Sequence, residues 1–496
     1  MGIIVRQSVI NSIISYVGVA LGFVITIWLY PNFFTTEQYG LTRVLLSLSM
    51  VLIQVSSMGI NSTIIRYFPF FRNKEKNHHG FLTIILLIPL VGFIIFGLLL
   101  FLFKGYILSL YESKSELLLD YYLYLFPLAF FILFFKTIES YTYALYNTVA
   151  SSFLHDIFIR LLTIAILFAY LWGWINFQEF MMLFVINYGI NLVLLSAYLL
   201  TISEVKLQID FEFLDNELLK KMLNYGAYSF FGSIATVILG NIDILMLGAM
   251  VGLGNTGIYA IAFYIGSAIK IPRQSILKIS APIVSDAIKN DNYHLVANIY
   301  KRSSLNLVIA GGLLFCGIVA NLHNLNEILP SSYAGGTLVI ITVGFANYFE
   351  ISTGINGAII INSKHFRFDL YSTIALIVLT VVLNYLFIPV YGILGAAIGT
   401  ATAIVLYNMV KVFYVWKKFS MHPFNIRMIP AILITGITLF LALITSTLDN
   451  PYWDILLRSI SITVFYIGII RLLNLSEDLN KLIHSSLKRF QNLLPI

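Results

Sequence analysis

The sequence predicts an all-α, polytopic membrane protein, and three observations lead to this fold class. First, 59% of the 496 residues are hydrophobic and only 11% are Asp, Glu, Lys or Arg, against about 25% charged residues in soluble domains. Second, the mean hydropathy is +0.90, which implies more apolar surface than a water-soluble fold can bury. Third, apolar runs of the length that crosses a bilayer, about 20 residues, recur along the whole chain.

The first half of the chain holds six such runs. The first of them carries no charge from Gln7 to Tyr30 and is longer than the apolar core of a signal peptide, so we expect it to remain as the first helix. A charged stretch follows the sixth run at 203–222, and it predicts an aqueous linker because a membrane span could not hold so many charges. The six predicted helices cover about residues 8–31, 41–60, 80–103, 119–146, 152–173 and 178–201.

The second half holds eight further runs, which makes fourteen transmembrane helices in all. They cover about residues 223–249, 254–278, 302–322, 335–361, 370–388, 391–414, 428–446 and 453–472. The predicted parts of the chain are an N-lobe with helices 1–6 at 1–202, a cytoplasmic linker at 203–222, a C-lobe with helices 7–12 at 223–418, helices 13 and 14 at 419–475, and a cytoplasmic amphipathic tail at 476–496.

The distribution of basic residues predicts the orientation. Short loops rich in Lys and Arg stay in the cytoplasm. Most of the 30 Lys and Arg fall in one set of alternate loops, which includes both termini, whereas the opposite set holds Lys104 and Lys114. Both ends of the chain are therefore expected in the cytoplasm, and the even number of helices agrees with this.

An internal repeat is visible when residues 15–41 are laid over 232–258. The two segments share a turn pattern that ends in Tyr-Gly-Leu and Thr-Gly-Ile, and Asn147 falls on Asn362 under nearly the same shift. Because the shift carries odd helices onto odd helices, the two six-helix lobes are expected to be parallel repeats around an axis along the membrane normal. Helices 13 and 14 have no counterpart in the first lobe.

Several functional classes are excluded or weakened by what the sequence lacks. The single cysteine, Cys316, excludes a disulfide framework and a thiol metal site. No GxxxxGK[ST] motif is present, so ATP hydrolysis is not expected to drive the protein. The net charge of +7 is explained by topology, and no nucleic-acid partner is expected. The loops on the outer side are short, which argues against a membrane enzyme with an outer catalytic domain.

Two segments carry a resemblance to a known family. They are EQYGLTRVLLSLSMVLIQVSSMGI at 37–60 and GNIDILMLGAMVGLGNTGIYAIAF at 240–263. With the arrangement of six, six and two helices, the chain resembles the polysaccharide-transporter branch of the multidrug/oligosaccharidyl-lipid/polysaccharide exporter superfamily, which includes the O-antigen flippases. The resemblance implies transport of polyprenyl-pyrophosphate-linked oligosaccharides to the outer leaflet of the bacterial inner membrane. It also implies alternating access, a coupled cation gradient, and other polysaccharide-assembly membrane proteins as partners.

Basic residues within the predicted helices are candidates for binding a pyrophosphate. A charge in the hydrocarbon region costs at least about 2.5 kcal/mol, so it needs a partner or a function. Arg43, Lys270 and Arg273 are the predicted pyrophosphate ligands, with interface anchoring and snorkelling as the alternatives. Lys136 either lines the cleft or is neutralised by Glu139. The sugar is expected near the polar residues Gln54, Tyr141 and Asn347.

Acidic residues within the helices are candidates for coupling an ion. Asp243 has no basic neighbour in the sequence, so it needs a cation, a proton or a distant base, unless it lies at the outer interface. Glu350 also lacks a base within one turn and is expected to be protonated or paired across the cleft. The resemblance suggests sodium between helices 7, 11 and 12, and proton coupling stays open. The ion-coupling candidates are Asp243, Glu350, Asn384, Thr400 and Thr402.

The function predicted from the sequence is a lipid-linked oligosaccharide flippase that serves cell-surface polysaccharide biosynthesis. No cofactor is expected other than a coupling sodium ion or proton. The first alternative is a multidrug cation antiporter of the same superfamily, which would need an acidic cleft. The second alternative is a membrane enzyme that acts on lipid-linked sugars, and the short outer loops argue against it.

Overall fold

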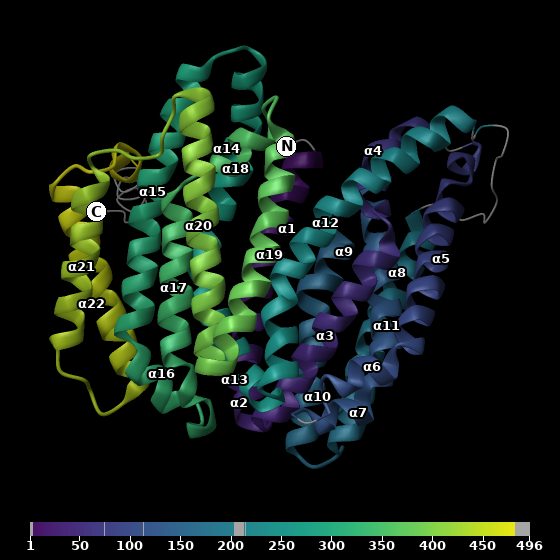
Figure 1. Cartoon of the computed structure of the whole chain (residues 1–496), viewed down its shortest axis with the longest axis horizontal. Coiled ribbons are helices and arrows are strands. Elements are labelled where there is room, and N and C mark those ends of the chain that lie inside the picture. Colours follow the sequence, from purple (N-terminus) through teal and green to yellow (C-terminus); the bar gives the residue numbers. More distant parts are fainter. Residues whose placement is uncertain (1–2, 74, 113, 203–212, 214, 482–496) are drawn as a thin grey trace, which may run out of the picture. The chain divides into compact units, whose positions relative to one another are not determined.

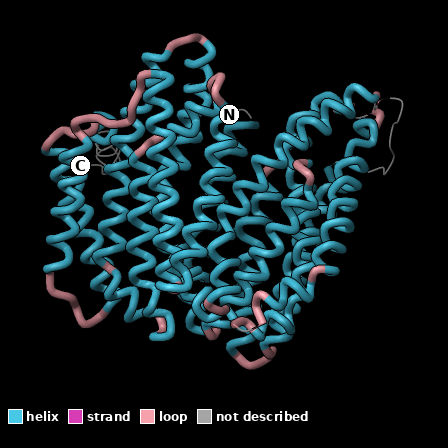
Figure 2. The backbone as a smooth tube through the Cα atoms, in the orientation of Figure 1, coloured by secondary structure: helices cyan, strands magenta, loops and turns pink. Residues whose placement is uncertain are grey.

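The computed structural model describes residues 3–73, 75–112, 114–202, 213 and 215–481. All regular elements in these ranges are helices, joined by short loops (Figure 2). Twelve helical segments among the described residues are long and apolar enough to cross a membrane. The chain is therefore an all-helical, multi-pass membrane protein, as the sequence predicts.

The internal contacts divide the chain into two units, Met1–Gly257 and Ile258–Ile496. This division does not test the predicted lobes or their repeat relation. It also does not test the predicted cytoplasmic position of both termini, so all three stay predictions. Most of the predicted linker, at 203–212 and 214, and most of the predicted tail, at 482–496, lie outside the described residues.

Unit 1 is built from the helices labelled α1 to α12 in Figure 1, together with the start of α13. Two π-helical segments, η1 (Val24–Leu29) and η4 (Leu154–Phe158), interrupt the first and fifth predicted helices. The helices are α1 (Ile3–Phe23), α2 (Tyr30–Phe33), α3 (Thr36–Ser57), α4 (Ile60–Phe71), α5 (Phe81–Leu102), α6 (Lys104–Ser109), α7 (Glu116–Tyr121), α8 (Leu125–Ala144), α9 (Val149–Phe153), α10 (Ile159–Leu171), α11 (Phe177–Ile202), α12 (Asn216–Met250) and α13 (Leu253–Ser267).

Unit 2 contains the rest of α13 and the helices α14 to α22. Its central helix α15 packs against α14, α17, α21 and α22. The helices are α14 (Ile271–Lys289), α15 (Tyr293–Ala320), α16 (Leu322–Ile328), α17 (Thr337–Ser352), α18 (Asn356–Ile361), α19 (Phe366–Tyr391), α20 (Ile393–Phe419), α21 (Met428–Ile444) and α22 (Pro451–Leu472).

The twelve candidate spans correspond to predicted helices 1–7, 9–12 and 14. The prediction of one continuous eighth helix at 254–278 is wrong. The helix α13 ends at Ser267, a 3₁₀ turn covers Ala268–Lys270, and α14 runs on to Lys289. Pro272, in the first turn of α14, explains the break, because proline lacks the N–H that a continuous α-helix needs.

Two other predicted helices also differ from expectation. The tenth, expected at 335–361, is interrupted between α17, which ends at Ser352, and α18, which begins at Asn356. The thirteenth is α21, an apolar helix of 17 residues that is shorter than the twelve candidate spans. The total of fourteen transmembrane helices therefore stays a prediction.

Polar side chains define where several helices begin. Thr35 accepts a hydrogen bond from the backbone N–H of Gln38, whose side chain accepts one from the N–H of Thr35, and this capping box starts α3. Asn450 accepts hydrogen bonds from the N–H groups of Tyr452 and Trp453, and Pro451 follows it as the first residue of α22. These caps satisfy donors that lipid could not hydrate.

The core of unit 1 is rich in aromatic side chains from α4, α5 and α8. Phe68, Phe71, Phe81 and Tyr141 are almost fully buried and pack together, with several ring centroids 4.6 to 5.7 Å apart. Large apolar side chains also remain exposed along many helices, for example on α5 and α19. This exposure is expected of a protein whose outer surface is covered by lipid rather than by water.

Close backbone contact joins α3 to the start of α13 within unit 1. A Cβ atom added at Gly40 would lie 1.9 Å from the carbonyl oxygen of Leu253, and one added at Gly257 would lie 2.3 Å from that of Thr36. Small residues that permit such an approach are typical of helix contacts in membranes.

We therefore expect Gly40→Ala to destabilise the protein, by about 1 to 3 kcal/mol, because backbone atoms must move to accommodate the methyl group. Thermal unfolding of the purified protein in detergent measures this effect. The matched control is Gly240→Ala on α12, where an added Cβ meets nothing within 4 Å. Equal melting temperatures for the two variants would contradict the packing argument.

In unit 2, α15 and α21 are joined by buried polar contacts as well as by apolar packing. Cys316 is fully buried and its Sγ donates to the carbonyl oxygen of Thr435 at 3.2 Å. The hydroxyl of Thr435 lies 3.1 Å from that of Tyr466 on α22. Helices α15, α21 and α22 thus form one packed group, in which α21 and α22 stand side by side in Figure 1.

The described part of the predicted tail, 476–481, is held against α15. Asp478 forms an ion pair with Arg302, and Asn306 Nδ2 donates to Asp478 Oδ2 at 2.9 Å. The hydrogen bond from Arg302 is the main cause that lowers the pKa of Asp478 below its usual value. The start of the tail is therefore a docked segment of unit 2.

Candidate functional site

Glu350 on α17 binds two cations from the broken helix α13–α14. Lys270 Nζ lies 2.8 Å from Glu350 Oε2, and Arg273 Nη1 donates to Glu350 Oε1. The side chains of Lys270, Arg273 and Glu350 are 34%, 19% and 15% exposed. Three charged groups, with one net positive charge, are thus gathered within unit 2.

This arrangement agrees with one of the two alternatives expected for Glu350, which is pairing with a base from elsewhere in the chain. No base lies within a turn of it in the sequence, but Arg273, 77 residues earlier in the chain, lies beside it in the fold. Glu350 is paired inside unit 2, and a protonated, unpaired carboxyl group is not what the structure shows. Lys270 and Arg273 remain candidate anion ligands, although one carboxylate already neutralises them in part.

The break in the helix and the side chain of Asn347 explain how this cluster is held. Lys270 is the last residue of the 3₁₀ turn, and Pro272 follows it at the start of α14. Asn347 on α17 donates to the carbonyl oxygen of Gly266 at 3.0 Å, one turn before Lys270. Asn347 is only 1% exposed. Its amide therefore supports the broken helix, and its role as a sugar ligand stays a prediction.

Arg43, on α3 in unit 1, lies among tyrosines. Its guanidinium carbon is 4.6 Å from the ring centre of Tyr39 and 5.6 Å from that of Tyr30. These distances are typical of cation–π contacts. The Nε atom of Arg43 is buried without a hydrogen-bond partner, and the ion pairs of the described residues include no carboxylate bound to Arg43.

The other predicted substrate ligands of unit 1 lie in different surroundings. Tyr141 is 2% exposed and packs edge to face on Phe68, so it belongs to the aromatic core of unit 1, and its contact with the sugar stays a prediction. Lys136 Nζ lies 3.6 Å from Met50 Sδ, while Glu139 accepts a hydrogen bond from the hydroxyl of Tyr143 at 3.0 Å. Gln54 on α3 is partly exposed.

The predicted ion-coupling residues are divided between the two units. Asp243 is buried on α12 of unit 1. In unit 2, Asn384 is fully buried on α19 against Gly399 of α20, and Thr400 and Thr402 follow on α20, partly exposed. Within the described ranges, no group of three or more His, Cys, Asp or Glu side chains could hold a metal ion. A sodium ion at Asp243 stays a prediction.

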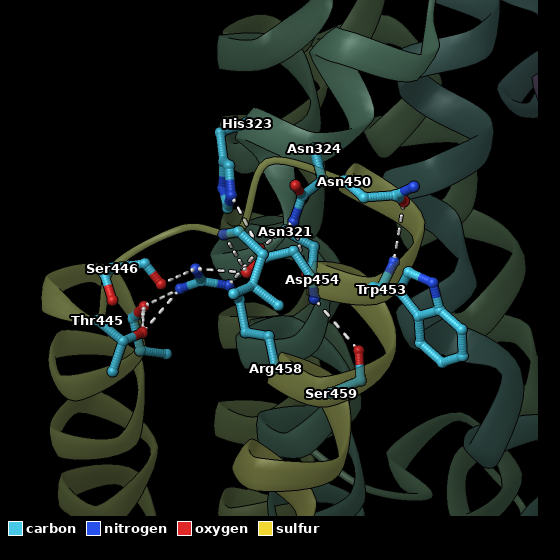
Figure 3. A network of polar contacts seen from close by, with 12 residues as sticks. Asn321, His323, Asn324, Thr445, Ser446, Asn450, Trp453, Asp454, Arg458 and Ser459 are labelled. Atoms are coloured by element: carbon cyan, nitrogen blue, oxygen red, sulfur yellow. Dashed lines mark hydrogen bonds and ion pairs between the residues drawn. The ribbon is translucent and has the colours of Figure 1, made fainter.

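A buried ion pair in unit 2 was missed from the sequence. Arg458 donates from Nε to Asp454 Oδ2 at 2.9 Å, and both side chains are about 5% exposed or less. Figure 3 shows how this pair also binds α16 and the end of α21: Asn324 Nδ2 donates to Asp454 at 2.6 Å and Arg458 Nη1 donates to Thr445 Oγ1 at 2.8 Å. His323 Nε2 lies 3.1 Å from Asp454. The spacing of four residues on one helix could have indicated the pair.

Two further charged pairs occur within the helices. Arg160 Nη1, at the start of α10, lies 3.7 Å from Asp156 Oδ1 one turn earlier on η4. Lys411 on α20 forms an ion pair with Asp369 on α19, with 2.6 Å between Nζ and Oδ1. Each of these acids is matched by at least one base, whereas Lys270 and Arg273 share one acid.

The fold defines a class, the multi-pass helical membrane proteins. Comparison with known families identifies the group more closely. Residues 4–288, more than half of the chain, match the family described as polysaccharide biosynthesis protein, and the chain belongs to this family. The family predicted from the sequence is therefore confirmed.

Similar proteins agree with this assignment. A curated relative, the probable flippase AglR of Haloferax volcanii, is 24% identical over 201 residues, which are 38% of this chain. The match spans 41% of the length of that relative. Among solved structures, the lipid II flippase MurJ in an inward closed conformation is similar with a TM-score of 0.74 and 15% identity, covering 94% of this chain and 99% of that one.

A multidrug transporter has the same fold. An inward-facing MATE family transporter of the MOP superfamily is similar with a TM-score of 0.64 and 16% identity, over 83% of this chain and 98% of that one. At such identities the similarity concerns the fold alone. This lipid II flippase and this multidrug transporter thus share their fold with the chain.

Proposed function

We propose that this protein is a flippase that moves a polyprenyl-pyrophosphate-linked oligosaccharide from the cytoplasmic to the outer leaflet of the bacterial inner membrane. The product serves a cell-surface polysaccharide, such as the O-antigen of lipopolysaccharide. The family description supports a role in polysaccharide biosynthesis, and the relative described as a probable flippase supports transport across the bilayer. We propose a transporter and not an enzyme.

The observation that carries this proposal is Arg43. Arg43 is a permanently charged side chain on an apolar helix, and tyrosine rings lie beside it. None of the ion pairs of the described residues joins a carboxylate to Arg43. A cation in such a place is costly unless an anion binds to it. The guanidinium group matches phosphate oxygens with two parallel hydrogen bonds. We propose separate anion ligands in each unit: Arg43 in unit 1, and Lys270 with Arg273 in unit 2.

The coupling ion belongs to the same proposal. Transporters with internal repeats move their substrates by alternating access. Within unit 1, Asp243 is proposed to bind the coupling ion, which is sodium or a proton. Within unit 2, Asn384, Thr400 and Thr402 offer oxygen atoms of the kind that a hard cation prefers.

Depletion of the protein in its native cell tests the proposal. We expect polyprenyl-pyrophosphate oligosaccharide to accumulate on the cytoplasmic side of the membrane, where a membrane-impermeant glycosidase added to intact spheroplasts cannot reach it. A wild-type copy should reverse the accumulation. If the lipid-linked sugar stays at its normal level after depletion, the protein is not its flippase.

The second candidate function is export of cationic drugs, because the MATE transporter has the same fold. Binding of a cationic drug favours acidic side chains, whereas Arg43, Lys270 and Arg273 together have one described carboxylate partner, Glu350. Deletion of the protein is therefore expected to leave susceptibility to cationic drugs unchanged. A clear increase in susceptibility would favour this candidate over the flippase.

A further inference from the structure

We propose that Glu350 is a built-in counter-anion, which occupies Lys270 and Arg273 when no substrate is bound and is displaced from them by the diphosphate of the substrate. This inference rests on the proposed function for the identity of the substrate. It assigns to Glu350 the role of setting the affinity of the site, in place of the ion-coupling role expected from the sequence.

The geometry of the carboxylate is the first argument. Each oxygen of Glu350 takes a different cation: Oε2 lies 2.8 Å from Lys270 Nζ, and Oε1 accepts from Arg273 Nη1. The two cations are therefore held at a spacing that one anion with two oxygen atoms can bridge. A diphosphate offers more such oxygen atoms and a larger negative charge, so it can compete for both cations at once.

The hydrogen-bonding capacity left in the cluster is the second argument. Lys270 and Arg273 have donors only, and Arg273 Nε is buried without a hydrogen-bond partner among the described residues. The cluster also has one more positive than negative charge. Both the unused donors and the excess charge favour a ligand that brings acceptor oxygens, and they disfavour a metal ion or a cationic drug.

The local backbone is the third argument. Glu350 lies three residues after Asn347 on α17, on the same side of that helix, and Asn347 is fixed by its hydrogen bond to Gly266. Lys270, by contrast, ends a 3₁₀ turn, and Pro272 weakens the helix immediately after it. The anion thus stands on a continuous helix while the cations stand at a break, where small backbone changes can alter their contacts.

The pair of Asp369 and Lys411 shows what a purely structural pair looks like in the same unit. It joins one acid to one base at 2.6 Å, the Lys411 side chain is 7% exposed, and its ammonium lies 4.3 Å from the ring centre of Tyr407. Lys270 is much more exposed, at 34%. Asp369 is therefore the matched control for Glu350.

Titration of the purified full-length protein with inorganic pyrophosphate tests the proposal. We expect Glu350→Gln to bind pyrophosphate about tenfold more tightly than wild type, because a competing charged hydrogen-bond acceptor is removed. Asp369→Asn should change the affinity by less than about twofold, since it frees one enclosed lysine only. In the double variant with Arg273→Gln, the gain should disappear.

An unchanged or weaker affinity in folded Glu350→Gln protein would overturn the proposal, because a merely structural carboxylate gives no gain. If the Glu350→Gln variant does not fold, Lys270→Gln provides the test, because Glu350 can still pair with Arg273 in that variant. We expect Lys270→Gln to lose at least about tenfold in pyrophosphate affinity. A wild-type affinity of Lys270→Gln would overturn the proposal. The proposed function fails separately, if depletion of the protein leaves lipid-linked oligosaccharide at its normal level.

Discussion

Replacement of Arg43 by alanine is expected to reduce flipping of the lipid-linked oligosaccharide by at least about tenfold, since a hydrogen bond to a charged group contributes about 1.5 to 3 kcal/mol. Arg43→Lys should retain part of the activity, because it keeps the charge but loses the planar guanidinium fork. The measurement is the rate at which a fluorescent polyprenyl-pyrophosphate oligosaccharide becomes accessible in proteoliposomes that contain the purified protein.

Arg66 on α4 offers a matched control in the same unit. Its guanidinium carbon lies 4.2 Å from the ring centre of Tyr225, so it also makes a cation–π contact, but its side chain is exposed. Arg66→Ala should flip at close to the wild-type rate. If Arg43→Ala is folded, by its melting temperature, and flips as fast as wild type, then Arg43 does not bind the substrate.

The largest expected effect on stability comes from the buried pair of Asp454 and Arg458. Arg458→Ala leaves Asp454 as a buried carboxylate without its main partner, and such a change costs about 3 to 5 kcal/mol. Arg458 also donates to Thr445 and to the carbonyl oxygen of Ser446, so these hydrogen bonds between the end of α21 and α22 are lost as well. Thermal unfolding in detergent should show a large fall in melting temperature.

An exposed pair in the same unit provides the comparison. Arg427 Nη1 lies 3.7 Å from Glu477 Oε1, and the two side chains are 47% and 69% exposed. Arg427→Ala should change the stability by no more than about 1 kcal/mol. A similar melting temperature for Arg427→Ala and Arg458→Ala would show that burial of the Asp454–Arg458 pair has little energetic importance.

The helices were the most predictable part of the fold. A membrane span needs a long apolar run, and such runs give the positions of twelve spans directly. The break at Ala268–Lys270 was missed because the helix was predicted from the length of the segment at 254–278, although Pro272 was a visible signal. The interruption at 353–355 between α17 and α18 was also missed, although Gly354, which has a φ of +67°, lies in it.

The site was less predictable because sequence does not show which face of a membrane helix points inward. In soluble proteins an apolar stripe marks the buried face, but in lipid both the inner and outer faces are apolar. Tyr141 and Asn347 were therefore assigned to a substrate wall, whereas both are buried in protein contacts. The partners of Glu350 come from a distant part of the chain, and only the fold brings them together.

The burial of Cys316 has a practical consequence for labelling. The only thiol of the chain is fully enclosed and donates to the carbonyl oxygen of Thr435. The native protein is therefore a low-background host for membrane-impermeant maleimide reagents, without prior removal of its cysteine. A single cysteine introduced at the exposed Leu448, between α21 and α22, would react from one side of the membrane only, and the side that reacts reports the orientation of the chain.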